Sequence, residues 1–281
     1  MSGLKAWETG VMFWAGDRPA ETLDTLRELG FRCGQIGIPG QLALDSRMTQ
    51  DWKKALEQAN FTVYTVFAAF EGESYADIPT VQRTVGFIPR VTREVRERRM
   101  LEVSDFAAHL SVPAIATHVG FIPEDTSHPD YFAVREMVRR VCDHAVSHQQ
   151  TFALETGQER ASVLLDFLLD VNRRNLGINF DPANMILYGT GDPIESLVVV
   201  GQHVVSVHCK DGDWPPPEVP GALGAERPLG QGSVDLKAFL AGLKKIGYKG
   251  PLTIERETHD KDQRLRDLKE GRQLLEELKE S

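Results

Sequence analysis

Cysteine is scarce in this sequence. Cys33, Cys142 and Cys209 are far apart, their number is odd, and no Cys-x-x-Cys pair occurs. A domain held together by disulfides normally has an even set of cysteines at short spacings, so this class is excluded. Because such a chain fits a reducing compartment, we expect a cytoplasmic protein.

Positive charge is also in short supply. The chain has 32 Lys and Arg residues against 41 Asp and Glu residues, which gives a net charge of −9. Its most arginine-rich stretch, Arg90–Arg99, is interrupted by Glu94 and Glu97, so no basic stripe forms. Proteins that bind nucleic acid by neutralising its phosphates normally carry such a stripe, and we expect no nucleic-acid partner.

Long apolar runs are absent as well. The apolar run near the start, Val11–Ala15, is too short for a signal peptide. The uncharged stretch His109–Pro123 falls short of the ~20 apolar residues that a membrane helix needs, so we expect no membrane segment. Glycine and proline follow no fixed period, which excludes a collagen-like or low-complexity chain.

The 281 residues do contain a regular alternation of apolar runs and amphipathic segments. The runs predicted as strands are Glu8–Trp14, Cys33–Ile38, Phe61–Ala68, Ala114–Val119, Phe152–Glu155, Gly177–Asp181, Val204–His208 and Leu252–Glu255. The segments predicted as helices are Ala20–Leu29, Asp51–Gln58, Ile88–Ala108, Tyr131–His148, Arg160–Asn172, Pro193–Val200, Leu236–Ile246 and Asp262–Lys279. Strands that alternate with helices in this way pair in parallel.

Two architectures contain such units. An open doubly wound sheet usually has a glycine-rich G-x-G-x-x-G turn after its first strand, and residues 15–19 lack it. Eight units of about 35 residues match a (β/α)8 barrel, which typically has about 250 residues. We therefore predict an α/β fold, a (β/α)8 TIM barrel, as a single domain over residues 1–281.

Charged and polar side chains stand where the later predicted strands end. They include Glu155, Asp181, His208 and Glu255, one for each of four successive strands. Ligands of a barrel gather at this end, and packing alone would favour Val, Ile or Leu there. Three converging carboxylates repel one another unless a cation neutralises them. One divalent metal ion held by these four residues is the expected cofactor, with Mn2+ ahead of Mg2+, Co2+ and Zn2+.

Each of these residues also has a structural interpretation. A single Glu at a strand end is usually a solvated rim residue, and a single His is more often structural than a ligand. Asp181-Pro182 could begin a helix as its N-cap and first residue. Cys209 points away from the side of His208, whereas Lys210 points the same way as the histidine.

The strand ends resemble the xylose isomerase-like barrel superfamily of sugar isomerases, epimerases, dehydratases and endonucleases. The segments that carry the resemblance are residues 153–158 (ALETGQ), 179–184 (NFDPAN), 207–211 (VHCKD), 228–235 (PLGQGSVD) and 252–257 (LTIERE), with His118-Val-Gly120 before them. The resemblance implies that Glu155, Asp181, His208 and Glu255 are metal ligands. It also implies that Glu155 and Glu255 exchange protons with a carbon beside a carbonyl, a step that a metal makes feasible.

The sequence departs from the motifs of two branches of this superfamily. The endonuclease branch needs extra histidines and an Asp-x-His pair before its Gly-x-Gly loop, and residues 225–229 lack this pair. Asn184 stands where both that branch and the ketose 3-epimerases have a histidine. Trp214 lies where the epimerases usually have an arginine. We expect no endonuclease, and a substrate pocket that differs from that of the known epimerases.

Loops are expected to shape the pocket. The segment from Phe70 to Arg90 is predicted to cover the site, with Phe70, Tyr75 and Phe87 either stacking on a sugar ring or docking on the core. Gly230 and Gly232 would allow the backbone to approach a substrate. The predicted substrate-binding residues are His118, Asn184, Lys210 and Arg227; Lys210 and Arg227, together with Arg256, are either anion contacts or surface ion-pair partners.

Three functions stay open at this point. The first is a metal-dependent isomerase or epimerase acting on a ketose, a keto-inositol or a related sugar, phosphorylated or not. The second is a lyase or dehydratase acting on a keto-sugar or 3-keto-glycoside with the same metal and base. The third is a non-catalytic binding protein that keeps the metal as a staple. The expected partner is a small sugar, and association of several copies is expected by analogy.

Overall fold

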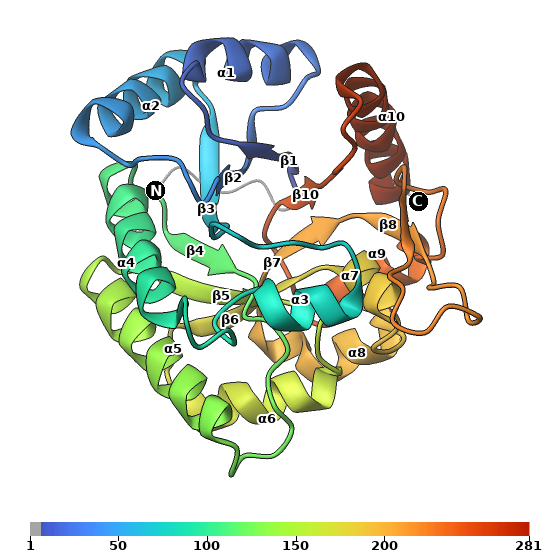
Figure 1. Cartoon of the computed structure of the whole chain (residues 1–281). Helices are drawn as coiled ribbons and strands as arrows, with labels where there is room; N and C mark the ends of the chain where they lie inside the picture. Colours follow the sequence, from blue (N-terminus) through green and yellow to red (C-terminus); the bar gives the residue numbers. More distant parts are fainter. Residues whose placement is uncertain (1–6, 281) are drawn as a thin grey trace.

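The computed structural model describes residues 7–280. Within them, eight parallel strands close into a barrel in the order β1-β10-β7-β6-β5-β4-β3-β2, with helices around the outside (Figure 1). The predicted (β/α)8 barrel is therefore confirmed. Two further strands, β8 and β9, form a separate antiparallel hairpin.

The strands follow the predicted runs closely. Their bounds are β1 Thr9–Trp14, β2 Cys33–Ile38, β3 Thr62–Ala68, β4 Ala114–Thr117, β5 Thr151–Glu155, β6 Leu176–Phe180, β7 Val204–Cys209, β8 Asp211–Asp213, β9 Ala225–Arg227 and β10 Leu252–Ile254. The helices are α1 Pro19–Glu28, α2 Ser46–Ala59, α3 Ile78–Thr84, α4 Arg93–His109, α5 Pro129–Ser147, α6 Ala161–Val171, α7 Pro182–Tyr188, α8 Pro193–Val200, α9 Leu236–Lys245 and α10 Lys261–Glu280. A 3-10 turn, Gly201–His203, precedes β7.

Side chains alternate between two buried regions along each strand. On β1, Val11 and Phe13 belong to the large apolar layer between barrel and helices, whereas Met12 packs with Phe67, Ala116 and Ala153 in a small inner cluster. This alternation is the period of two of a strand. It leaves the inner cluster small, so the rest of the barrel interior is available for polar side chains.

Some element bounds differ from the prediction. Helix α2 begins five residues earlier, at Ser46, because the Asp45 side chain accepts the Met48 N–H as an N-cap. Helix α4 begins only at Arg93, whose guanidinium binds the carbonyls of Phe87 and Ile88 in the preceding turn. The hairpin β8–β9 and the short helix α3 were not predicted, and α7 was foreseen only as a possible helix start at Asp181-Pro182.

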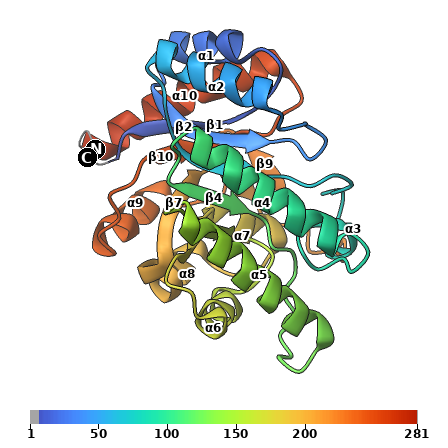
Figure 2. The ribbon, with the colours of Figure 1, turned by 90° about the vertical axis from the view of Figure 1, so that its left-hand side faces the viewer.

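The segment after β3, predicted to cover the site, contains the short helix α3. In the side view of Figure 2, α3 lies at one end of the barrel and the last turns of α10 lie at the other. The suggestion that Phe70 and Phe87 stack on a sugar is wrong, because both are buried in the core with their ring centroids 5.5 Å apart. Tyr75 alone of the three aromatics stays half exposed.

Among residues 7–280, no helix is long and apolar enough to cross a bilayer.

Candidate metal centre

Four strand ends bring their polar side chains to one point. Glu155 ends β5, Asp181 precedes α7, His208 lies in β7 and Glu255 follows β10. One ligand atom from each of the four lies within 4.8 Å of every other. All four residues are buried, with exposed fractions between 0% and 8%. The structure thus gathers the residues that the sequence proposed as metal ligands, and it does so away from solvent.

Asp181 uses its two carboxylate oxygens differently. Its Oδ1 accepts the Asn184 N–H at 3.0 Å, so the residue is indeed the N-cap of α7. Its Oδ2 is buried and has no hydrogen-bond partner among the described residues, although it lies 3.8 Å from His208 Nδ1. A buried carboxylate oxygen without a partner is costly unless a cation meets it. Asp181 can therefore cap α7 with Oδ1 and bind a metal with Oδ2.

His208 presents one ring nitrogen to the carboxylates and the other to an amide. Its Nε2 lies 3.2 Å from Gln35 Oε1, and the Gln35 amide nitrogen donates to Asn179 Oδ1 at 3.2 Å. Because the Gln35 oxygen can only accept, Nε2 carries a proton, and Nδ1 is the nitrogen that could bind a metal. His208 Nδ1 then faces Glu155 Oε1 at 2.7 Å and Glu255 Oε2 at 3.1 Å. A second-layer acceptor that fixes the tautomer in this way is typical of a metal-binding histidine.

Glu155 is held from a second direction by His118. His118 Nε2 lies 3.1 Å from Glu155 Oε2, and the Gln158 amide nitrogen lies 3.3 Å from His118 Nδ1. Asn179 also donates to Glu155 Oε1, at 3.4 Å. These contacts fix the Glu155 carboxylate between a ring N–H on one side and the cluster on the other.

Glu255 is held by a buried cation. Lys210 Nζ lies 3.2 Å from Glu255 Oε2 and 2.7 Å from Glu257 Oε2. Burial by itself raises the pKa of the Glu255 carboxyl, but the positive charges of His208 and Lys210 outweigh it and hold that pKa well below its ordinary value. Glu255 is therefore ionised at neutral pH.

The remaining charges show that the cluster is short of positive charge. Burial, together with the charges of Glu155 and Glu255, raises the pKa of Asp181 to about 6. Burial by itself lowers the pKa of His208. The Glu255 and Glu155 carboxylates raise it by more than burial lowers it, so the pKa lies well above its ordinary value. Three buried carboxylates around one imidazole, with the pKa values of Asp181 and His208 both raised, fit a divalent cation at their centre. Such an ion would be bound by Asp181 Oδ2 and His208 Nδ1, among other atoms.

Several polar residues of this site were missed in the sequence. Gln35, Asn179 and Ser206 form a layer below the cluster, where Ser206 Oγ donates to Asn179 Oδ1 at 2.5 Å. Two of them have a signal in the sequence, because Asn179 precedes Asp181 by two residues and Ser206 precedes His208 by two, and alternate residues of a strand share a face. Gln35 has a weaker signal, as a polar residue in the buried strand β2.

The glycines after β9 bind a side chain of the protein itself. Asp211 Oδ2 accepts the N–H groups of Gly230 and Gly232 at 2.9 and 3.0 Å, and its Oδ1 accepts those of Gly212 and Val234. A Cβ on Gly232 would stand 2.3 Å from Asp211 Oδ1. The prediction was that the backbone approaches a substrate at these glycines; the close approach in the structure is to the Asp211 carboxylate.

The other predicted site residues lie at different distances from the cluster. Lys210 and His118 contact it directly, and the buried Asn184 is tied to it through the bond of its backbone N–H to Asp181. Arg227 lies on the β8–β9 hairpin, half exposed, with its Nε 2.6 Å from Asp213 Oδ2. Arg256, with 12% of its side chain exposed, lies between Glu226 and Asp267, which argues for an ion-pair role.

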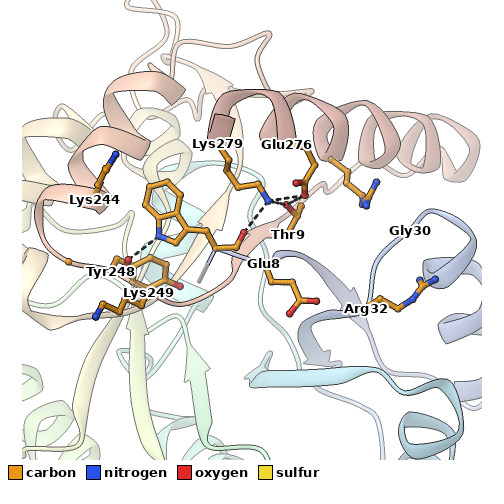
Figure 3. Close-up of a pocket in the computed structure, with 12 residues that line it drawn as sticks. Glu8, Thr9, Gly30, Arg32, Lys244, Tyr248, Lys249, Glu276 and Lys279 are labelled. Carbon is orange, nitrogen blue, oxygen red and sulfur yellow. Dashed lines mark hydrogen bonds and ion pairs between the residues drawn. The ribbon is translucent and has the colours of Figure 1, made fainter. Parts of the chain in front are cut away.

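Two cavities lie at opposite ends of the barrel. One of about 400 Å³ opens beside the cluster and is lined by Trp14, Arg18, Glu255, Glu257 and Arg264, among others. A roomier one of about 780 Å³ lies where the strands begin, between Trp7, Arg32, Tyr248 and the end of α10 (Figure 3). Ligand sites of such barrels lie where the strands end, so the smaller cavity is the candidate substrate site.

Comparison with known proteins places the chain in a family. A crystal structure of a xylose isomerase domain protein from Planctomyces limnophilus is 45% identical, covers 97% of each chain and superposes with a TM-score of 0.92. The rhizopine catabolism protein MocC of Rhizobium meliloti is 32% identical over 40% of this chain and 36% of that protein. The L-ribulose 3-epimerase of Methylomonas sp. is 31% identical over 39% of this chain and 32% of its own length.

The chain spans 59% or less of the length of the curated relatives that it matches. The family model described as xylose isomerase-like TIM barrel, by contrast, matches residues 23–278, which include all four residues of the cluster. The chain therefore belongs to the xylose isomerase-like TIM barrel family.

Proposed function

We propose that this protein is a divalent-metal-dependent sugar isomerase or epimerase that moves a proton on a carbon beside a carbonyl. The observation that carries the proposal is the buried meeting of Glu155, Asp181, His208 and Glu255, with ligand atoms within 4.8 Å of one another. The family and the 3-epimerase among the relatives support the same reaction class.

The proposed metal ligands are these four residues. A divalent ion bound there would polarise the carbonyl and hydroxyl oxygens of a sugar and so acidify the carbon between them. Three carboxylates and one imidazole suit Mn2+, Mg2+, Co2+ or Zn2+, and we propose Mn2+ as the first ion to test.

Glu155 and Glu255 are the proposed proton-transfer pair. They approach His208 Nδ1 from two strands, at 2.7 and 3.1 Å, so a sugar above the histidine would have one carboxylate on either side. Lys210 keeps Glu255 ionised and able to accept a proton. The N–H of His118 holds Glu155 in place, so that a proton can be returned on the opposite face.

The proposed substrate is a small ketose, keto-inositol or related polyol bound at the cluster, next to the cavity that Glu255 lines. His118, Asn184 and Lys210 are the proposed substrate contacts, since they border the cluster. A contact from Arg227 stays a prediction, as do a single domain over residues 1–281, an assembly of several copies and a cytoplasmic location.

The test is a screen of ketoses, inososes and 3-keto-glycosides in deuterated water, with the metal-reconstituted protein followed by NMR. Exchange of a carbon-bound proton for deuterium, without loss of water or of an aglycone, is the expected result. Loss of water or of an aglycone would replace the proposal by the lyase function, and binding without turnover under every divalent metal would replace it by the binding function.

Two variants test the proton-transfer roles. Glu155→Gln and Glu255→Gln should abolish the exchange, and Glu124→Gln, an exposed carboxylate paired with Arg160, should leave it unchanged. Full exchange in both active-site variants would remove Glu155 and Glu255 from the mechanism.

A further inference from the structure

We infer that the protein has a second metal site on the outside of the barrel, formed by Asp105, His144 and His148, and that it binds a transition metal of the Zn2+, Ni2+ or Cu2+ type. Asp105 belongs to α4, His144 lies in the last turn of α5 and His148 is the C-cap that follows that helix. The two helices pack side by side on the barrel surface (Figure 1). The site would therefore join two neighbouring helices of the outer ring.

The geometry of the three side chains converges on one oxygen. His144 Nε2 lies 2.7 Å from Asp105 Oδ1, and His148 Nε2 lies 2.9 Å from the same atom. The two histidines are four residues apart, which places them one turn apart on one face of the helix. Their ring centroids are 5.2 Å apart, and each ring presents the same nitrogen to the carboxylate. Three candidate ligand atoms thus meet at one point.

The space between the ligand atoms fits a small ion after a slight adjustment. With bonds of about 2.0–2.1 Å, tetrahedral ligands around Zn2+ stand roughly 3.3 Å apart. The two nitrogen–oxygen separations, 2.7 and 2.9 Å, are shorter than this, so the rings must move outward by about half an ångström. The histidine side chains are 30% and 29% exposed and that of Asp105 is 52% exposed, so all three have room to move. A fourth position then stays open to water.

The donor set distinguishes this site from the buried centre. Two imidazoles and one carboxylate suit Zn2+, Cu2+ and Ni2+, whereas Mg2+ and Mn2+ prefer oxygen-rich sites such as the cluster around Glu155. No residue is shared between the two groups. The outer site can therefore be occupied, emptied or removed by mutation without changing any ligand of the inner one.

The experiment counts metal equivalents. The full-length chain, without an affinity tag and stripped of metal, is titrated with Zn2+ against a chromophoric chelator. The double variant His144→Ala/His148→Ala should lose one Zn2+ equivalent relative to the natural chain, and Asp105→Asn should weaken the same equivalent. His259→Ala, an exposed histidine in the loop after β10, is the matched control and should lose nothing.

Two further measurements keep the outer site separate from the inner one. In a His208→Ala background the double variant should still remove one equivalent, whatever the buried cluster binds. Zn2+ should also raise the melting temperature of the natural chain more than that of the double variant, because the ion joins α4 to α5. Equal Zn2+ stoichiometry and affinity in the natural chain and the double variant would overturn the inference.

Discussion

The imidazole of His118 donates its Nε2 proton to Glu155, with 3.1 Å between His118 Nε2 and Glu155 Oε2. The assignment of the proton follows from Gln158, whose amide nitrogen can only donate and lies 3.3 Å from His118 Nδ1. The Gln158 amide nitrogen also lies 3.3 Å from the Tyr188 hydroxyl oxygen. Glu155 is thus oriented by a chain of three side chains that reaches away from the cluster.

From this series of hydrogen-bonded side chains we predict that His118 affects the rate of the reaction. His118→Ala should leave the fold intact and lower kcat about 10- to 100-fold, because Glu155 loses the group that aims it. Steady-state kinetics with the substrate found in the NMR screen measures the effect, and His109→Ala on α4 is the control. An unchanged kcat in His118→Ala would show that Glu155 needs no partner there.

A second prediction concerns Gln35 and metal affinity. Gln35→Leu removes the acceptor that holds His208 Nε2, and we expect the affinity of the inner site for Mn2+ to fall about 10- to 100-fold. Gln41→Leu changes an exposed glutamine in the loop after the same strand and should have no effect. Calorimetric titration of the two variants gives the comparison, and equal affinities would argue against a second-layer role for Gln35.

The barrel could be predicted because its signals are local. Each strand is a short apolar run and most of the long helices are amphipathic, and both patterns can be seen within about 20 residues of sequence. The short helix α3 and the β8–β9 hairpin were missed because three to seven residues are too few for a clear period. The start of α2 was missed because it depends on a cap, the bond from Met48 N–H to Asp45.

Only the part of the site that stands at the ends of the strands could be predicted from the sequence. Glu155, Asp181, His208 and Glu255 stand at equivalent places in successive units, so the fold alone implies that they meet. The contact between Gln35 and His208 joins residues 173 positions apart, and it exists only because β2 and β7 face each other across a closed barrel. No local pattern carries that information.

A third prediction separates the two roles of Asp181. Asparagine caps a helix about as well as aspartate, so Asp181→Asn should unfold at nearly the same denaturant concentration as the natural chain. It should nevertheless lose most of its metal affinity, because the charged oxygen at Oδ2 is gone. Asp192→Asn, at the equivalent cap of α8, is the control and should keep both properties. Retained metal affinity in Asp181→Asn would remove Asp181 from the ligand set.

A fourth prediction concerns Gly232 and the Asp211 carboxylate. A Cβ at Gly232 would stand 2.3 Å from Asp211 Oδ1 and 2.6 Å from the Gly212 nitrogen, so Gly232→Ala must displace one of them. We expect a loss of about 1–3 kcal/mol in the free energy of unfolding, measured by urea denaturation. Gly16→Ala, where a Cβ meets nothing within 4 Å, should change stability by about 0.5 kcal/mol or less. Equal effects of the two substitutions would contradict the packing argument.

The last prediction concerns pH and the buried carboxyl of Glu159. Its Oε1 accepts the Ile122 N–H at 3.0 Å and its Oε2 has no partner among the described residues, so burial raises the pKa to about 8. The unfolded chain has the ordinary value near 4.5, so between these two pH values the folded state holds a proton that the unfolded state has lost. Stability is therefore highest below pH 4.5 as far as this group is concerned, and it falls by up to about 1.4 kcal/mol per pH unit up to about pH 8.

Glu159→Gln keeps an oxygen for the Ile122 N–H and removes the titration. The free energy of unfolding of the variant minus that of the natural chain should therefore increase as the pH rises from 5 to 8. Above pH 8 this difference should stay constant. Urea denaturation at each pH measures it, with Glu124→Gln, an exposed carboxylate, as the control whose difference from the natural chain stays constant. If the curves of Glu159→Gln and the natural chain run parallel over this range, Glu159 is ionised in the folded protein and a cation must reach its Oε2.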